Sequence, residues 1–108
     1  MLKFLETAVF TRQIVGLMSD VDYAALQGFL IVDPEAGDLI QGTGGLRKIR
    51  WHEPQRGKGK RSGTRIIYYW YEPRSLIYML VAYSKGDRDD LSAREKRVLK
   101  ELVQKELE

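Results

Sequence analysis

The stretch Gly42–Tyr71, GTGGLRKIRWHEPQRGKGKRSGTRIIYYWY, joins two strand-like runs through a basic segment. Its first run, Leu46–Trp51, alternates basic and apolar residues with a period of two, as a strand with two different faces does. Its second run, Thr64–Tyr71, is β-branched and aromatic, and so is Leu76–Tyr83 further on. Glu72–Ser75 supplies a proline-containing turn between the last two runs. The three runs predict an antiparallel meander.

Segments with helical spacing of apolar residues precede and follow this meander in the sequence. A short strand is expected at Leu2–Leu5, and apolar residues then recur with helical spacing from Ala8 onwards. Ser19 is a suitable N-cap for a second helix, which the Asp33-Pro34 pair ends because the residue before proline disfavours helix. Ser92 begins a capping box before an amphipathic C-terminal helix. We therefore expect an α+β fold: a small, mainly antiparallel sheet with two N-terminal helices and one C-terminal helix.

Two further expectations follow from length and from the glycines. With 108 residues, the chain is expected to form one domain over residues 1–108. Glu35–Gly45 is glycine-rich and is expected to be an ordered connection between the second helix and the meander.

Positive charge is concentrated in Leu46–Arg65. This segment holds eight Lys and Arg residues and one acid, Glu53, which makes +7 in a chain of net +3, so the rest of the chain sums to −4. The cations are Arg47, Lys48, Arg50, Arg56, Lys58, Lys60, Arg61 and Arg65. Such a local field suits a polyanion such as nucleic acid.

The cations on the strands are more informative than those between them. Lys48 and Arg50 are expected on one side of their strand, and Arg65 is expected on the neighbouring strand. Because like charges facing each other destabilise a sheet, their grouping indicates that an anion binds between them. Nearby aromatic residues, including Tyr83, offer stacking surfaces for unpaired bases.

Several kinds of site are excluded or disfavoured. The chain has no cysteine and one histidine, His52, which excludes zinc-thiolate sites and sites built on paired histidines. Gly57, Gly59 and Gly63 do not match a dinucleotide or P-loop fingerprint. The acidic residues Asp87, Asp89 and Asp90 are interpreted as favourable charge before the last helix, not as a metal site. No metal and no cofactor is expected, and no signal peptide or membrane helix; a cytoplasmic location fits.

Cleavage of RNA requires neither metal nor histidine. The 2′-hydroxyl attacks the adjacent phosphate, and the protein must hold that geometry and neutralise the transition state. Arginine suits the second task because its planar fork of donors matches phosphate oxygens. A lysine crowded by other cations can have a lowered pKa and accept a proton. A site made of Lys, Arg and Tyr is therefore chemically sufficient.

Three segments, DLIQGTGGLRKIRW, GKGKRSGTRIIYYWY and LVAYSKGD, resemble the HigB branch of the RelE/ParE toxin superfamily, and the resemblance extends over essentially the whole chain. It implies a toxin of a type II toxin–antitoxin system that enters the ribosomal A site and cleaves mRNA there. It also implies a small helix-turn-helix antitoxin as partner. We expect the toxin to be monomeric outside the antitoxin complex.

The resemblance also implies roles for individual residues. Arg65 would contact the transition-state phosphate, and Lys48, Arg50 and Lys85 would share charge stabilisation and proton transfer. Arg47, Tyr83 and the loop cations Arg56, Lys58, Lys60 and Arg61 would bind RNA or the ribosome. The chain departs from RelE where Gly86 and Ser92 replace an arginine and a C-terminal tyrosine. Either Lys85 or Tyr83 substitutes for them, or the mechanism differs.

Two alternatives stay open from the sequence. One is a member that resembles ParE and inhibits DNA gyrase without cleaving RNA. The retained cluster of Lys48, Arg50 and Arg65 argues against it, because contact with gyrase requires no phosphate-directed site. The other is a plain RNA- or DNA-binding module, whose binding would depend steeply on salt without any cleaved product.

Overall fold

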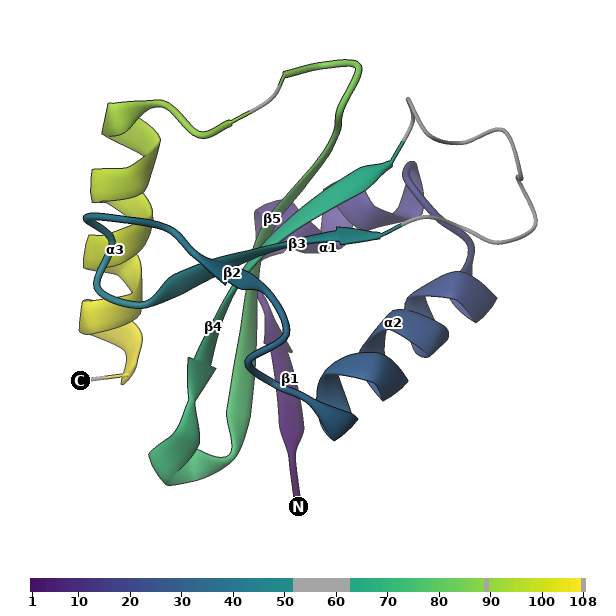
Figure 1. The fold of residues 1–108 in the computed structure, drawn as a ribbon, viewed down its shortest axis with the longest axis horizontal. Helices are drawn as coiled ribbons and strands as arrows, with labels where there is room; N and C mark the ends of the chain where they lie inside the picture. Colours follow the sequence, from purple (N-terminus) through teal and green to yellow (C-terminus); the bar gives the residue numbers. More distant parts are fainter. Residues whose placement is uncertain (52–62, 89, 108) are drawn as a thin grey trace.

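The computed structural model describes residues 1–51, 63–88 and 90–107. Within these ranges, five strands form one sheet with the order β1-β5-β4-β3-β2, and three α-helices flank it (Figure 1). The strands are β1 (Lys3–Glu6), β2 (Asp38–Leu39), β3 (Leu46–Trp51), β4 (Thr64–Tyr71) and β5 (Leu76–Ser84). The helices are α1 (Ala8–Val15), α2 (Asp20–Val32) and α3 (Ala93–Leu107), and a 3-10 turn, η3, covers Glu72–Arg74.

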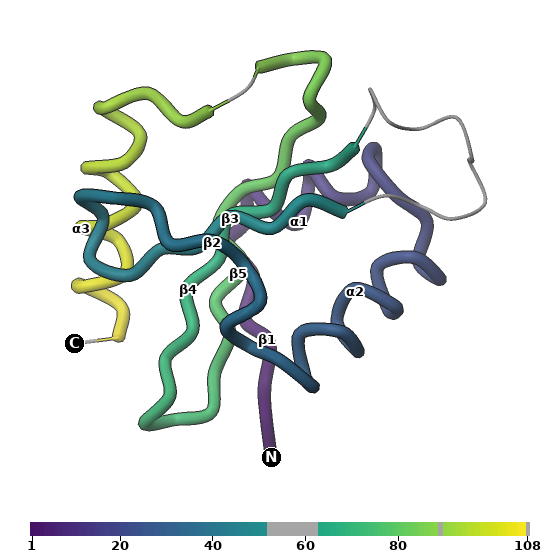
Figure 2. The backbone as a smooth tube through the Cα atoms, in the orientation of Figure 1, coloured from purple at the N-terminus to yellow at the C-terminus, as the bar shows by residue number. Residues whose placement is uncertain are grey.

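The expected α+β fold is confirmed. Strands β3, β4 and β5 pair antiparallel in sequence order, and the N-terminal strand β1 pairs parallel to β5. The backbone trace in Figure 2 shows β1 lying along β5 although the chain between them is long. The sequence did not predict β2, which has only two residues and pairs with β3 inside the connection that was expected to be ordered.

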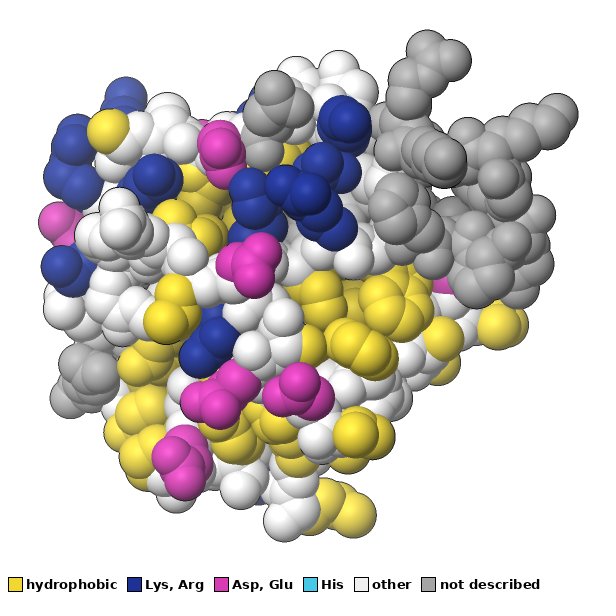
Figure 3. Space-filling view, viewed as in Figure 1, with side chains coloured by type: hydrophobic (Ala, Val, Ile, Leu, Met, Phe, Trp, Pro, Cys, Tyr) yellow, Lys and Arg dark blue, Asp and Glu magenta, His cyan; other side chains and the backbone are white. Residues whose placement is uncertain are grey.

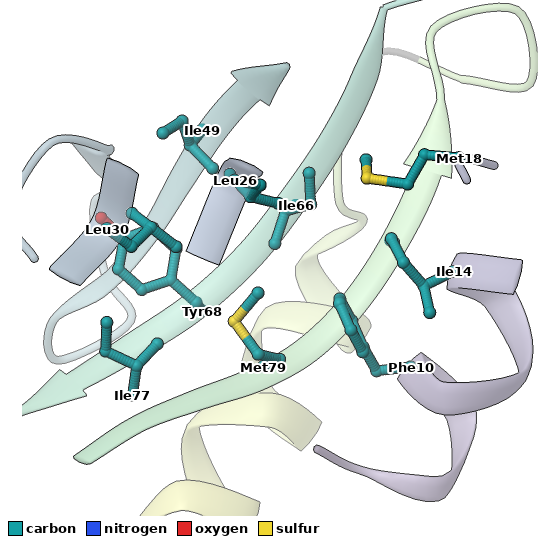
Figure 4. Close-up of a cluster of buried hydrophobic side chains, with 11 residues drawn as sticks. Phe10, Ile14, Met18, Leu26, Leu30, Ile49, Ile66, Tyr68, Ile77 and Met79 are labelled. Carbon is teal, nitrogen blue, oxygen red and sulfur yellow. The ribbon is translucent and has the colours of Figure 1, made fainter. Parts of the chain in front are cut away.

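The sheet separates two hydrophobic cores. Helices α1 and α2 cover one face, where Phe10, Leu26 and Leu30 meet Ile66 and Tyr68 of β4 (Figure 4). Helix α3 covers the other face and contributes Leu99, Val103 and Leu107 to a second cluster. Alternation along the strands supplies both cores, since neighbouring residues point to opposite faces.

Capping residues begin the helices as their sequence indicates. The Ser19 side chain accepts a hydrogen bond from the backbone N–H of Asp22 at 3.1 Å. Ser92 and Glu95 form a reciprocal capping box: Glu95 Oε1 accepts from the Ser92 N–H at 2.8 Å, and Ser92 Oγ accepts from the Glu95 N–H at 3.1 Å. These contacts fix where α2 and α3 start.

A β-bulge interrupts the pairing of β4 with β5. Ile67 pairs with Val81, but the next residue, Tyr68, pairs with Met79, which leaves Leu80 as an extra residue in β5. Leu80 and Val81 therefore both lie against the α3-side core. The bulge reverses the alternation that follows it, because one inserted residue exchanges the two faces of a strand. Tyr83 consequently lies on the α3 side of the sheet.

Candidate functional site

Neighbouring side chains of strand β3 point to opposite faces of the sheet. Leu46 belongs to the α3-side core, whereas Ile49 and Trp51 pack on the side of α1 and α2. By alternation from Leu46, Lys48 and Arg50 lie on the α3 side. The period of two in the sequence predicted that Lys48 and Arg50 lie on the face opposite to Ile49 and Trp51.

Arg50, Arg65 and Tyr83 form a row across three strands. Arg65 on β4 is the register partner of Arg50 on β3 and of Tyr83 on β5. Two arginines at directly opposed positions repel each other, which costs stability when no anion lies between them. The row therefore has the composition of an anion site.

Arg65 is the most enclosed cation of this row. The residue is only 6% exposed. Its Nη1 donates to the carbonyl of Gly63 at 3.2 Å, while its Nε has no acceptor among the described residues. Buried donors are normally satisfied, so the unpaired Nε of this guanidinium is a donor that an acceptor oxygen of a ligand or a water can satisfy.

Lys48 is paired with a carboxylate that sequence analysis assigned to another role. Its Nζ lies 2.8 Å from Oδ1 of Asp90. The hydrogen bond from Lys48 lowers the pKa of Asp90, and the charges of Lys96 and Arg50 lower it further. Asp90 thus lies among three cations instead of acting only as helix N-terminal charge, and Asp89 lies outside the described residues.

Tyr83 is held between β4 and the segment before α3. It is 4% exposed, and the guanidinium of Arg88 lies 4.5 Å from the centre of its ring. Arg88 also forms an ion pair with Glu95. Burial raises the pKa of Tyr83, with a smaller contribution from the charge of Asp90. Among the described residues, Arg88 is thus the cation that covers the face of this tyrosine.

Lys85 lies in the turn that follows β5, where it is exposed. Its backbone N–H donates to the carbonyl of Gly63 at 3.1 Å, and the same carbonyl accepts from Arg65. The turn is therefore tied to the start of β4 beside Arg65. This brings Lys85 to the same end of the sheet as the row of Arg50, Arg65 and Tyr83.

Arg47 has a structural partner on the other side of β3. Its Nη1 donates to the carbonyls of Glu35 and Gly37 at 3.0 and 2.8 Å. These bonds hold the connection after α2 onto the sheet. The remaining predicted RNA-binding cations, Arg56, Lys58, Lys60 and Arg61, lie outside the described residues, as does His52.

The charge distribution on this side of the molecule is uneven. Figure 3 shows Lys and Arg side chains gathered in the upper part of the view, over α3 and the neighbouring end of the sheet, with several acidic side chains below them. Within residues 1–51, 63–88 and 90–107, no group of three or more His, Cys, Asp or Glu residues could hold a metal ion. No described helix is long and apolar enough to cross a membrane.

Comparison of this structure with known proteins identifies the fold. No family model matches the sequence. The isolated E. coli RelE toxin aligns with 94% of this chain and 99% of its own chain, with a TM-score of 0.56 and 15% sequence identity. The chain has the RelE fold. A free RelE variant with two arginines replaced by alanine aligns over 98% of each chain, with a TM-score of 0.51 and 16% identity.

Sequence reasoning missed two groups that the RelE fold brings to the site. Asp90 reaches Lys48 over 42 positions of sequence, and Arg88 covers Tyr83 from a segment without regular structure. Neither contact follows a local spacing rule. The only available signal was that Arg88 and Asp90 follow the last strand, at the end of the sheet where Arg65 lies.

Proposed function

We propose that this protein is the toxin of a type II toxin–antitoxin system, of the HigB branch, and a metal-independent endoribonuclease that cleaves mRNA in the ribosomal A site. The observation that carries this proposal is the buried Arg65, whose Nε lacks an acceptor among the described residues, opposite Arg50 in the sheet. A phosphate oxygen would satisfy that donor, and the RelE fold supports the choice of RNA as substrate.

In the proposed reaction the 2′-hydroxyl of the mRNA attacks its own 3′-phosphate. Arg65 binds the phosphate oxygens on which charge develops, a role that its planar fork of donors suits. As the 2′-oxygen bonds to phosphorus, the bond from phosphorus to the 5′-oxygen breaks and a 2′,3′-cyclic phosphate forms. Lys48, Arg50 and Lys85 share charge stabilisation, the removal of the proton from the 2′-hydroxyl and the delivery of a proton to the leaving 5′-oxygen. Tyr83 holds the nucleotide in position from the neighbouring strand.

The partners follow from the same proposal. The ribosome presents the mRNA, and the loop cations Arg56, Lys58, Lys60 and Arg61 bind ribosomal RNA. A helix-turn-helix antitoxin neutralises the toxin, which is otherwise a cytoplasmic monomer. Arg47 is assigned to holding the connection after α2, because both of its bonds to backbone carbonyls serve that purpose.

Primer extension on a translated reporter mRNA tests the proposal in a purified translation mixture. We expect codon-phased cuts that disappear when ribosomes are omitted. Arg65→Lys keeps the charge but removes the fork of donors, and it should slow cleavage by at least about a hundredfold. Arg74→Lys is the matched control, since Arg74 is exposed at the opposite end of β4.

The same experiment separates the alternatives. Cuts without ribosomes would make the protein a free ribonuclease. Complete absence of cuts would favour gyrase inhibition or plain nucleic-acid binding. Cleavage by Arg65→Lys at the rate of the unmodified protein would show that the proposed phosphate site is wrong.

A further inference from the structure

Near the candidate site, no strand among the described residues pairs with the outer edge of β5. Strand β1 ends at Glu6, which pairs with Met79, but β5 continues to Ser84. Two side chains of the α1 region satisfy the backbone there. The hydroxyl of Thr7 donates to the carbonyl of Leu80 at 2.7 Å, and Oε1 of Gln13 accepts from the N–H of Ala82 at 2.8 Å.

A pocket of about 320 Å³ lies beside this edge, between the end of α1 and the turn after β5. This volume is at the lower end of the range for small-molecule pockets, roughly 300–1,000 Å³. Its lining residues are Gln13, Gly16, Leu17, Ala82, Tyr83, Asp87 and Arg88. The lining therefore combines small and apolar residues with three polar residues and one tyrosine.

The polar groups of the pocket have defined hydrogen-bonding character. Because Oε1 of Gln13 accepts from Ala82, the amide orientation is determined, and its amino group has no acceptor among the described residues. Asp87 contributes a carboxylate, which only accepts hydrogen bonds when ionised. Arg88 is held over the ring of Tyr83 and presents a planar group as one wall.

We propose that this pocket binds a guanine base of the RNA, which makes Gln13 and Asp87 specificity-determining residues. An unpaired guanine presents one acceptor, O6, beside two adjacent donors, N1–H and the N2 amino group. The carboxylate of Asp87 accepts from both donors, and the amide of Gln13 donates to O6. Adenine, cytosine and uracil lack a second adjacent donor, so each leaves one carboxylate oxygen without a partner.

The position of the pocket connects it to the proposed cleavage site. Tyr83 lines the pocket and is also the register partner of Arg65. The pocket lies at the edge of β5, with β5 between it and Arg65, so the RNA backbone would pass around this end of the sheet to reach the arginine that is proposed to bind the phosphate. The inference rests on the proposed function only for this connection, since base binding itself requires no cleavage.

Binding of short 2′-O-methyl RNAs tests the pocket separately from the nuclease, because these RNAs lack the hydroxyl that attacks. Four hexanucleotides, identical except for guanine, adenine, cytosine or uracil at one position, are titrated by fluorescence anisotropy. We expect the guanine RNA to bind about tenfold more tightly than the other three, as a bidentate base contact provides.

Two substitutions change the pocket without removing its structural contacts. Asp87→Asn replaces the acceptor-only carboxylate by an amide. Gln13→Glu keeps an acceptor for the Ala82 N–H but removes the donor to O6. Each should reduce the preference for guanine to less than about threefold. The control Glu101→Gln, which removes one negative charge as Asp87→Asn does but at an exposed position of α3, should retain it. Thermal unfolding of each variant confirms that it is folded.

The outcomes distinguish the pocket from the proposed function. Equal binding of all four RNAs, no binding of any, or a guanine preference that persists in both variants would show that the pocket does not bind guanine as proposed. Codon-phased cuts in the translation mixture, with no guanine preference in the binding assay, would support the proposed nuclease and contradict guanine binding by the pocket. A guanine preference that both variants lose, without cuts in the translation mixture, would support guanine binding by the pocket and contradict the proposed nuclease function.

Discussion

At the scale of the residue, Asp90 lies against Lys48, one of the cations of the proposed cleavage site. Its carboxylate lies 2.8 Å from Lys48, and Lys96 and Arg50 also act on its pKa. In the free protein this carboxylate competes with a polyanion for the same cations. Asp90 therefore balances the charge of the site when no RNA is present.

The substitution Asp90→Asn tests this competition. It removes the competing charge, so we expect non-cleavable RNA to bind several-fold more tightly at low salt, with a smaller gain at high salt. Anisotropy titrations at two salt concentrations measure the effect, and Asp20→Asn at the start of α2 is the control. Weaker or unchanged binding by Asp90→Asn would mean that Asp90 does not compete with the ligand.

Glu95, another single residue, is expected to make the stability of the fold depend on pH. The hydrogen bond from Arg88 lowers the pKa of Glu95, and the backbone N–H of Ser92 contributes. A carboxyl group whose pKa is lowered in the folded state stabilises the fold above its unfolded pKa of about 4.5, and this contribution is lost as the pH falls further. Stability should therefore decrease below about pH 4.5.

Thermal unfolding at pH 6 and pH 3.5, followed by circular dichroism, measures this loss. The variant Glu95→Gln retains an acceptor for the Ser92 cap but cannot form the ion pair with Arg88. We expect it to have a lower Tm than the unmodified protein at pH 6 and a smaller difference at pH 3.5. A difference of equal size at both pH values would exclude the charge of Glu95 as the cause.

At the scale of the element, the Tyr68 hydroxyl fastens the connection after α2 to the sheet. It accepts from the N–H of Gly37 at 2.9 Å and donates to the carbonyl of Pro34 at 2.8 Å. Tyr68 is fully buried, and burial raises its pKa. A Cβ at Gly37 would lie 2.9 Å from Cε1 of Tyr68, so glycine is required there for the two to approach.

The variant Tyr68→Phe should lower the free energy of unfolding by about 1–3 kcal/mol, because the buried N–H of Gly37 and carbonyl of Pro34 lose their partner. Urea unfolding measures it. Tyr71→Phe is the control and should change stability by less than about 0.5 kcal/mol, since no described residue is bonded to the Tyr71 hydroxyl. If the two variants are equally stable, the hydroxyl of Tyr68 does not hold the connection.

The bulge in β5 determines on which face of the sheet the residues after it lie, and the sequence did not predict it. The run Leu76–Tyr83 was correctly predicted as a strand from its β-branched and aromatic residues. Leu80 and Val81 are both apolar, so nothing in their order reveals that they share one face. That arrangement depends on the register with β4, which places Tyr83 beside Arg65. The side of the sheet on which Tyr83 lies was therefore not predictable.

At the scale of the whole molecule, the segment Leu46–Arg65 carries +7 in a chain of net +3. Lys48, Arg50 and Arg65 of this segment lie on two adjacent strands of the sheet and are proposed to act on one phosphate. The cations between β3 and β4 are proposed to bind the ribosome, where many phosphates contribute. The two groups are therefore expected to respond differently to salt.

The double substitution Lys58→Ala with Lys60→Ala tests the second group. It removes two phosphate contacts, so we expect weaker ribosome binding and a slope of affinity against salt reduced by about two. Sedimentation with purified ribosomes at several salt concentrations measures both quantities. Binding that is unaffected at every salt concentration would contradict the role of these lysines.

The sequence by itself determined the order and type of nearly all helices and strands. Local rules were sufficient because periods of two and of 3.6 residues, capping residues such as Ser19 and Ser92, and the Asp33-Pro34 stop act within a few positions. The two-residue strand β2 escaped prediction because it is too short to show a period. The sequence also indicated that Lys48, Arg50 and Arg65 belong together, since they lie on adjacent predicted strands.

Only the tertiary structure decided what completes this cluster. A one-residue bulge places Tyr83 opposite Arg65, and a loop contact between residues 42 positions apart pairs Asp90 with Lys48. The early end of β1 leaves the edge of β5 open beside Gln13 and so creates the pocket. Each of these depends on the register between distant segments, which is determined by how the whole chain packs and not by the residues nearby.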